Sequence, residues 1–422
     1  MKIKLVTFAP HPNFGTCLQS YALNKVLRDM GHDVEFIYNG RETNPIGFRR
    51  TVKKIIKAVL PSGIVAQIKE KKPPKYVKQI ENITAPSAPY ILTLPNNYLL
   101  YLLSKLPFYE RIYKFYKCRT LQWKKVYRFT FEDGNYKMKR LFIKSQYDKV
   151  VRDADLFITG SDQIWNPYCG GYNPMMFLEF VNDGTKCISY SSSISRPFLP
   201  DMLEQRIKNA LQKFQYIAVR EQKSVELLGN LLGRNDIRLV VDPTYLLSKE
   251  EWERFASHAT IEFSLPEKYI FCYFVGSKRA AIYEQMVKDV KRYTGIDNVI
   301  TLECYNRNLV YGDGLLYKDA GPYEWVYLLQ HSSYVCMDSF HATIFSLIFG
   351  KEFVVALKNS DNETSSQNTR MYDILNRYGL SHKLYDKFPD KWKETIDHKK
   401  LQTVVEQEKR ESYDFLVREV NE

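Results

Sequence analysis

Short apolar runs alternate with longer amphipathic stretches along most of the chain. Apolar runs separated by helical patterns are typical of buried parallel strands joined by right-handed crossover connections. In the first half of the chain, the expected strands are residues 3–8, 33–38, 155–160, 186–193, 216–219 and 237–242. In the second half, they are residues 268–276, 298–303, 334–338 and 352–357. The pattern therefore predicts an α/β protein with two successive parallel sheets.

A polar, charged stretch over residues 248–268 separates the two sets of strands, and no strand is expected after about residue 368. We expect an N-terminal Rossmann-like domain over residues 1–248, a C-terminal Rossmann-like domain over residues 249–367, and helices over residues 368–422. Two doubly wound domains that face a cleft, followed by a helical segment, form a GT-B-like arrangement. In such sheets, ligands bind outside the carboxyl ends of the strands.

Residues 41–150 are a basic, aromatic insertion in the first domain, which we expect to be mostly helical. They include 24 Lys and Arg but only 7 Asp and Glu, an excess of 17 positive charges in a chain whose net charge is +13. This composition suits a solvated amphipathic face with its aromatic side chains packed inward, or peripheral contact with an anionic membrane. It would also suit nucleic acid, but the chain carries no nucleic-acid module signature, so no such partner is expected.

The overall composition, 45% hydrophobic and 26% charged over 422 residues, excludes wholesale disorder. The seven cysteines are scattered without a CxxC pair, which argues against a disulfide framework or a Cys-rich zinc site. The first residues read as a strand rather than a signal peptide, and no apolar run reaches the length of a membrane-spanning helix. We therefore expect a soluble, cytoplasmic protein.

Polar side chains follow the first and third expected strands. Asn13 and Gln19 fall around the N-terminus of a helix, where free amides favour anions, although loops of this kind are common in α/β proteins. A second group, after residues 155–160, consists of Asp162, Gln163, Trp165 and Asn166. An aromatic face beside carboxylate and amide groups suits a carbohydrate, and the alternative is an Asp cap beside a core Trp. The sequence thus predicts an acceptor site for a sugar here.

Two further residues are candidates for the chemistry. Arg220 follows the strand at 216–219, where its guanidinium would bind a carboxylate or phosphate, or form an inert salt bridge. His341 falls in the first turn of a helix that Ser339 would cap, and it would hand a proton to a substrate or be structural. If the two domains face each other, Arg220 and His341 converge on one cleft.

Other chemistries lack sequence support. The chain contains no HExxH, no His/Cys ligand spacing, no GxGxxG after the first strand and no GxxxxGK[ST]. We therefore expect no metal and no bound cofactor.

Six motifs occur in a fixed order: NFGTCLQSYAL, GSDQIWN, VREQKSVELL, VVDPTYLL, DSFHATIFSLIFG and NTRMYDIL. They span roughly residues 1–40 and 150–380 and leave the basic insertion unmatched. As an ordered set, they resemble the polysaccharide pyruvyl transferase family.

The resemblance implies a GT-B-like fold, phosphoenolpyruvate as the donor, and a pyruvate ketal on a hexose of a surface-polysaccharide precursor as the product. It implies that Arg220 holds the donor's phosphate or carboxylate and that His341 is the acid/base residue. The chemistry of the residues, apart from the resemblance, makes Asp162 a candidate partner for a sugar hydroxyl, as base or orienter. Characterised members of the family have an Arg two residues before that His, where this chain has Ser339. Lys278 or Arg370 would supply the missing positive charge, or the donor differs.

The acceptor is expected to be a lipid-linked oligosaccharide, for which the basic insertion would provide a peripheral membrane contact. One alternative function is that of a nucleotide-sugar-dependent glycosyltransferase on the same architecture. Another is a non-catalytic glycan-binding protein. The sequence predicts neither the acceptor sugar nor the oligomeric state.

Overall fold

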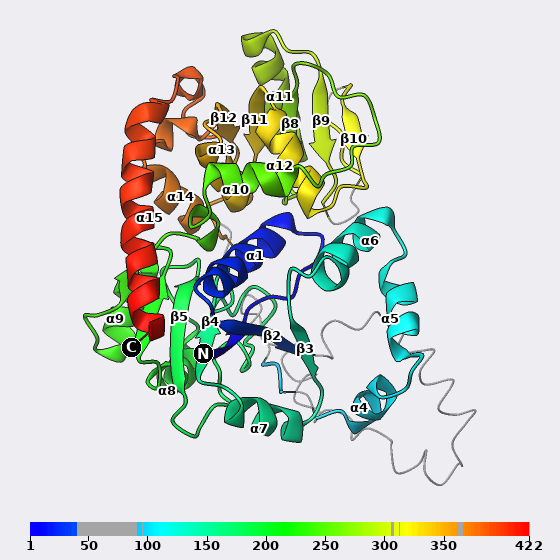
Figure 1. Cartoon of the computed structure of the whole chain (residues 1–422). Helices are drawn as coiled ribbons and strands as arrows, with labels where there is room; N and C mark the ends of the chain where they lie inside the picture. The colour runs from blue at the N-terminus through cyan, green and yellow to red at the C-terminus, as the bar shows by residue number, and fades with distance from the viewer. Residues whose placement is uncertain (40–90, 95, 305–307, 312, 362–365, 422) are drawn as a thin grey trace, which may run out of the picture.

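Two parallel β-sheets, one from each half of the chain, organise the computed structural model, which describes residues 1–39, 91–94, 96–304, 308–311, 313–361 and 366–421 (Figure 1). The first sheet consists of β1 (Lys2–Val6), β2 (Asp33–Asn39), β3 (Met138–Leu141), β4 (Leu156–Thr159), β5 (Lys186–Ser192), β6 (Tyr216–Val219) and β7 (Arg238–Leu239). The second consists of β8 (Ile270–Tyr273), β9 (Val299–Leu302), β10 (Leu315–Tyr317), β11 (Tyr334–Met337) and β12 (Phe353–Val355). Each of the ten expected strands overlaps an observed one, which confirms the predicted fold class.

Helices connect the strands of both sheets. In the first half they are α1 (Phe14–Asp29), α4 (Tyr98–Ser104), α5 (Tyr109–Lys117), α6 (Leu121–Tyr127), α7 (Lys144–Arg152), α8 (Asp201–Leu211) and α9 (Gln222–Leu232). In the second half they are α10 (Lys249–Ala256), α11 (Ala280–Thr294), α12 (Pro322–His331), α13 (Phe340–Ile348), α14 (Thr369–Arg377) and α15 (His398–Asn421). Short helical turns cover Arg128–Glu132, Pro243–Tyr245, Ser381–Lys383 and Lys391–Lys393. None of the helices in the described part of the chain is long and apolar enough to cross a membrane.

The strand order places a ligand site at the middle of each sheet. The first sheet runs β3-β2-β1-β4-β5-β6-β7 and the second β10-β9-β8-β11-β12. All neighbouring pairs are parallel. The chain direction along the sheet reverses between β1 and β4 and again between β8 and β11. Loops diverge at such switch points and leave a crevice at the carboxyl ends of the strands.

The structure corrects the expectation for the basic insertion in part. Residues 41–90 lie outside the described residues, and α4, α5 and α6 follow them as helices. Met138–Leu141, however, forms the edge strand β3, which pairs with β2. A short edge strand with charged side chains lacks the continuous apolar run of a buried strand, so the sequence pattern missed it. The edge strand β10 was also missed, because its three residues, LLY, are too few to form a recognisable apolar run.

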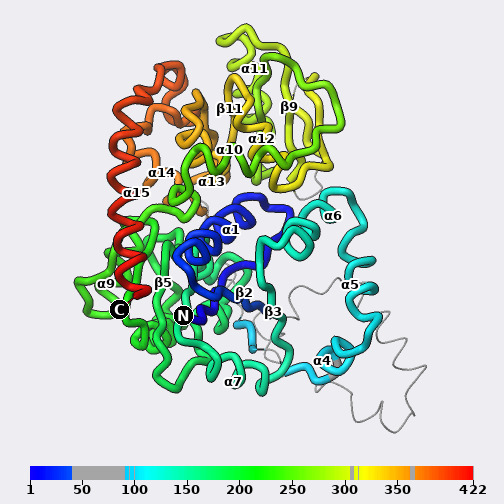
Figure 2. Tube along the Cα trace, viewed as in Figure 1, coloured from blue at the N-terminus to red at the C-terminus, as the bar shows by residue number. Residues whose placement is uncertain are grey.

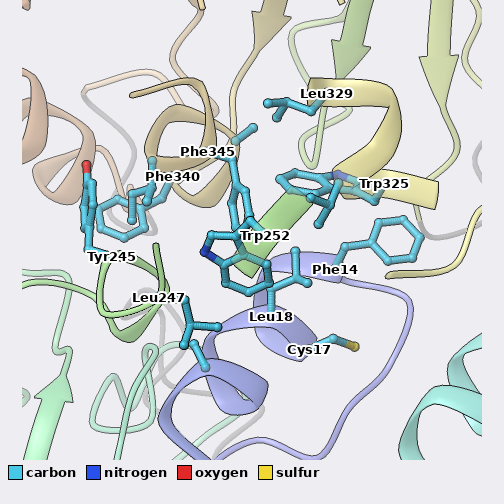
Figure 3. Packing of buried hydrophobic residues seen from close by; sticks show 14 of the residues in the cluster. Phe14, Cys17, Leu18, Tyr245, Leu247, Trp252, Trp325, Leu329, Phe340 and Phe345 are labelled. Carbon is cyan, nitrogen blue, oxygen red and sulfur yellow. The ribbon is translucent and has the colours of Figure 1, made fainter. Parts of the chain in front are cut away.

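An aromatic cluster joins the two halves of the molecule. Helix α1 of the first half contacts α12 and α13 of the second half, and Figure 2 shows this helix between the two sheets. Figure 3 shows Trp252 among Phe345, Leu18 and Trp325, all buried side chains. The ring centroids of Trp252 and Phe345 lie 4.7 Å apart, with the two rings packed edge to face. Apolar contacts of this extent hold the two sheets in a fixed relation.

The polar stretch at 248–268, expected to separate the two sets of strands, also forms helix α10 and contributes to the core. Ser248 and Glu251 form a capping box at the start of α10, the pattern in which each side chain bonds the other residue's amide. Trp252 of the same helix is fully buried in the aromatic cluster. The first sheet thus uses residues 2–239 and the second residues 270–355, while the domain boundaries at 248 and 367 stay predictions.

The C-terminal helices return to the first half. Residues 368–422 contain α14 and α15, as expected, and α15 runs along both halves in Figure 1. The amide of Val241, just after β7, donates to the Ser412 hydroxyl of α15 at 3.0 Å. The chain's last helix therefore ties its second half to the first.

Candidate active site

A cavity of about 240 Å³ lies where the switch points of the two sheets face each other. Its walls come from the segments that follow β1, β4, β8 and β11, and from the segment before and into α14. Gln163 of the first half donates to the Gln367 side chain of the second half across it, at 3.4 Å. Of the predicted site residues, the cavity brings together Asn13, Asp162, Gln163, Ser339, His341 and Arg370.

His341 occupies the first turn of α13, where the helix N-terminus meets the cavity. The Ser339 hydroxyl accepts the Ala342 amide at 3.4 Å, so Ser339 caps the helix as expected. The imidazole Nε2 lies 3.5 Å from Oδ2 of Asp242 and makes no hydrogen bond to any described residue. The structure therefore presents a buried, unbonded imidazole nitrogen at the site.

The backbone of α1 packs directly against the other side of this imidazole. A Cβ atom added to Gly15 would lie 2.2 Å from Nδ1 of His341. Only a glycine lets the first turn of α1 approach so closely. The N-termini of α1 and α13, one from each half, thus meet around His341. Both helix ends favour negative charge.

Asp242 is the carboxylate that links His341 to Arg220. Its Oδ2 accepts Nη1 of Arg220 at 2.9 Å, and its Oδ1 accepts the Thr244 amide at 3.1 Å and hydroxyl at 2.8 Å. Burial would raise the pKa of Asp242, but the charges of His341 and Arg220 and these hydrogen bonds hold it below its usual range. Asp242 is therefore ionised.

Three carboxylates surround Arg220, which lies behind the cavity wall. Its guanidinium donates to Asp242, to Glu221 at 3.1 Å and to Asp162 at 3.3 Å, and it stacks 4.3 Å from the centroid of the Phe340 ring. Burial would lower the pKa of Arg220, but the three carboxylates raise it instead. Burial raises the pKa of Glu221. Arg220 therefore stacks on Phe340 of the second half but does not line the cavity as expected, because its N–H groups bond carboxylates of its own half.

Asp162 projects into the cavity from an unusual backbone conformation. Its φ of 77° lies in the left-handed region, which side chains other than glycine seldom adopt. Its carboxylate accepts the Thr16 hydroxyl at 2.9 Å and its neighbour's amide at 2.8 Å. Burial would raise the pKa of Asp162, but the positive charges of Arg220, His341 and Arg370 have the larger effect, so the pKa is lowered. Strained backbones held by several bonds are typical of functional sites.

Two cations in the cavity wall lack an acidic partner. Neither Lys358 nor Arg370 forms an ion pair with a carboxylate of the described residues. Burial lowers the pKa of both side chains, and Arg370 lowers that of Lys358 further by repulsion. Both side chains are partly buried, and Asp338 and Asp162 attract Lys358 and Arg370, respectively, without forming an ion pair; two such positive charges favour an anionic ligand.

His11, also in the wall, is neutral. The Asn13 amide donates to its Nδ1 at 3.2 Å, which requires an unprotonated nitrogen. Burial lowers the pKa of His11 to about 4. The site thus contains two histidines in different surroundings: Nε2 of His341 lies 3.5 Å from Asp242, whereas burial outweighs the charge of Asp162 at His11.

Four predicted site residues lie elsewhere. Trp165 belongs to the core: its ring packs on Phe177 and Phe214, and its indole N–H donates to the Met176 carbonyl at 3.0 Å. Gln19 is fully buried and bonds Thr7 and the backbone of Thr16 and Ser161. Asn166 does not line the cavity, and its side-chain amide donates to the side-chain oxygen of Gln163. Lys278 is exposed and does not line the cavity. Lys358, rather than Lys278, contributes a cation to the cavity wall.

Sequence analysis missed Asp242, His11 and Lys358 as site residues, and it did not predict the contact of Gly15 with His341. Asp242 had a usable signal because it is the last residue of the expected strand at 237–242, in the motif VVDPTYLL. Lys358 likewise follows β12. His11 and Gly15 lie in the loop and helix that follow β1, and nothing in the sequence pattern marks their contact partners.

Comparison with known proteins adds the following similarities. A family model described as polysaccharide pyruvyl transferase matches residues 13–362. No curated protein matches the chain. The UDP-GlcNAc 2-epimerase from Neisseria meningitidis, bound to UDP-GlcNAc, is 10% identical with a TM-score of 0.45, over 100% of this chain and 99% of that one. UGT89C1 from Arabidopsis thaliana, complexed with quercetin, is 10% identical with a TM-score of 0.45, over 99% of this chain and 98% of that one.

Proposed function

The chain belongs to the polysaccharide pyruvyl transferase family, and from this premise we propose that it transfers the pyruvyl group of phosphoenolpyruvate to a hexose of a surface-polysaccharide precursor. The product would be a ketal that bridges two hydroxyls of one sugar. The observation that carries the proposal is the Nε2 of His341, which no described residue hydrogen-bonds, beside Asp242 in a cavity with two cations that form no ion pair in the described part of the chain.

The donor's two anionic groups match the charges of the cavity wall. Phosphoenolpyruvate carries a carboxylate and a phosphate, while Lys358 and Arg370 have no acidic partner among the described residues. The N-terminus of α13 adds amides that favour an anion. Because Arg220 already faces three carboxylates, we assign it to the ordering of Asp162 and Asp242 rather than to the grip on the donor.

The first half of the reaction requires an acid. A proton from His341 adds to C3 of the enol, and C2 becomes an electrophilic oxocarbenium carbon. One sugar hydroxyl adds to C2 and loses its proton, which gives an intermediate that still carries phosphate. Asp242 stabilises the imidazolium before the transfer, a task for which its charge and its 3.5 Å distance suit it.

The second half expels phosphate. The C2–O bond to phosphate breaks, and the neighbouring sugar oxygen stabilises the new cation at C2. A second hydroxyl of the same sugar adds to C2 and loses its proton, which closes the ketal ring. Asp162, whose carboxylate lies in the cavity wall, orients or deprotonates a sugar hydroxyl. The two sugar hydroxyls release two protons. One replaces the proton that His341 gave to C3, and the other protonates the released phosphate, so the reaction balances.

The test is phosphate release from phosphoenolpyruvate in the presence of galactosyl and mannosyl acceptors. We expect release by the native chain and a loss of roughly 100-fold or more in His341→Asn, which keeps a polar side chain but supplies no acid. His331→Asn, on the exposed end of α12, is the matched control. Release of a nucleoside diphosphate from nucleotide sugars, with none from phosphoenolpyruvate, would overturn the proposal in favour of a glycosyltransferase.

A further inference from the structure

A second cavity, of about 290 Å³, adjoins the first and shares Phe8 and His11 with it. It opens at the carboxyl ends of β1 and β2, and α5 and α6 of the basic insertion supply its outer wall. Figure 1 shows α6 beside the loop that leads into α1. Together the two cavities fall within the ordinary range for small-molecule sites, roughly 300–1,000 Å³.

The wall of the second cavity contains a cation and no acid. Lys117 and Trp123 line it, and the Lys117 Nζ lies 4.1 Å from the centroid of the Trp123 ring. Among the described residues, Lys117 has no carboxylate within ion-pair distance. Burial and, to a smaller extent, the charge of Arg140 together lower the pKa of Lys117 to about 8. An anion placed here would offset an otherwise uncompensated charge.

A second observation also indicates a ligand. The hydroxyl of Tyr38, at the end of β2, is buried and has no hydrogen-bond partner among the described residues, although Tyr38 lines the cavity. Buried hydroxyls are normally bonded, so one without a partner beside a cavity is a candidate ligand contact. Trp123 adds an aromatic face of the kind that packs against the C–H surface of a sugar.

We propose that this second cavity binds the phosphate-bearing part of the acceptor, with Lys117 and Tyr38 on the phosphate and Trp123 on the adjacent sugar. The inference rests on the proposed function, since the hexose to be modified would then reach past His11 into the first cavity. The shared chemistry is a sugar phosphate. Its source is either the diphosphate that joins the glycan to a lipid carrier or a phosphate within the glycan.

The first experiment measures binding without any reaction. Hexosyl 1-phosphates and hexose 6-phosphates are titrated while tryptophan fluorescence is recorded, with the methyl hexosides as neutral probes. Trp123 lines the cavity, whereas Trp165, Trp252, Trp325 and Trp392 are fully buried. Trp123→Phe should therefore abolish the fluorescence change on ligand binding. Calorimetry measures the affinity of that variant instead.

Lys117→Met keeps the aliphatic stem on Trp123 and removes the charge. We expect it to weaken sugar-phosphate binding at least 10-fold and to leave binding of the methyl hexosides unchanged. Lys124→Met, at an exposed position of α6, is the matched control and should change neither. A C1-phosphate preference assigns the carrier linkage, and a C6-phosphate preference assigns the glycan; both support the subsite.

Three results would overturn the inference: equal effects of Lys117→Met on charged and neutral probes, equal effects of Lys124→Met, or loss of sugar-phosphate binding in Arg370→Met with none in Lys117→Met. An unchanged melting temperature shows that each variant is folded. Failure of the proposed function is a separate result. Lys117-dependent binding without phosphate release from phosphoenolpyruvate would retain the subsite and reject the donor.

Discussion

His341 and Asp242, from opposite halves of the chain, lie 3.5 Å apart from Nε2 to Oδ2, and Arg220 donates to the same oxygen at 2.9 Å. One carboxylate oxygen thus connects the two residues that were expected to share a pocket. Because Asp242 comes shortly after β7 and His341 follows β11, the contact exists only when both sheets present their carboxyl ends to each other.

Asp242→Asn should lower both activity and stability. We expect phosphate release to fall roughly 100-fold, since an amide cannot stabilise the imidazolium of His341. We also expect the free energy of unfolding at pH 7 to fall by about 3 kcal/mol, because Arg220 loses a buried partner. Denaturant unfolding and phosphate release measure the two effects.

The Asp242 effect should depend on pH with a definite sign. Its pKa is lowered in the folded state, so its contribution is complete above the unfolded value of about 3.9 and is lost as pH falls below it. The stability gap between the native chain and Asp242→Asn should therefore narrow in acid. Asp236→Asn, at an exposed surface ion pair, is the control and should cost less than about 1 kcal/mol.

Lys358→Met and Arg370→Met should weaken donor binding. Both side chains line the first cavity and form no ion pair with a carboxylate in the described part of the chain. Each substitution therefore removes one positive charge that faces the donor. We expect the KM for phosphoenolpyruvate to rise about 10-fold or more, in line with a lost charge-assisted hydrogen bond. Lys278→Met, which removes an equal charge outside the cavity wall, should leave KM unchanged. An equal rise in Lys278→Met would show that net charge alone explains the effect.

Gly15→Ala should disable the site through His341. The added Cβ would lie 2.2 Å from Nδ1, so the imidazole or the helix must move. We expect destabilisation of about 2 kcal/mol, typical of an overpacked contact, together with loss of phosphate release. In a His341→Ala background the contacts with Nδ1 and Cγ are absent and only the Cβ of residue 341, at 2.8 Å, remains, so the same substitution should cost clearly less. Equal costs in both backgrounds would contradict the contact.

His11 should make the protein less stable as pH falls from about 6.5 to 4. Its pKa is about 4 when folded and about 6.5 when unfolded, so the unfolded state takes up the proton first. This contribution is complete above pH 6.5 and falls by at most about 3 kcal/mol toward pH 4. Unfolding of His11→Gln across this range should lack that component. Identical pH profiles for the variant and the native chain would show that His11 titrates normally.

The membrane contact predicted for the basic insertion can be tested on exposed apolar residues. Leu102 of α4 is 60% exposed and Phe115 of α5 is 71% exposed, among cations that each contribute about 1 kcal/mol at an anionic surface. We expect cosedimentation with anionic vesicles but not with neutral ones, and a clear reduction in Leu102→Ser/Phe115→Ser. Met202→Ser, at a 59% exposed position of α8, is the control. Equal partition into both vesicle types would remove the membrane contact.

The strands were predictable because buried parallel strands must be apolar on both faces, as β4, β8 and β11 are. The place of the site was predictable as well, since ligands bind at the carboxyl ends of such strands. His341 and Asp162 were therefore selected because each follows a predicted strand, and both line the cavity; Arg370 was named only as a source for the charge missing at Ser339. The edge strand β3 was not, because partial exposure lets charged residues interrupt its apolar pattern.

The direction of each side chain required the tertiary structure. Trp165 and Gln163 are two residues apart in one motif, yet Trp165 turns into the core and Gln163 into the cavity. Lys278 and Lys358 both follow strands of the second sheet, but only Lys358 reaches the wall. The sequence by itself determined which segments end at the cleft. The packing of α1 against α13 decided which atoms meet there, because contacts between segments over 300 residues apart depend on how the two halves dock, which local patterns do not encode.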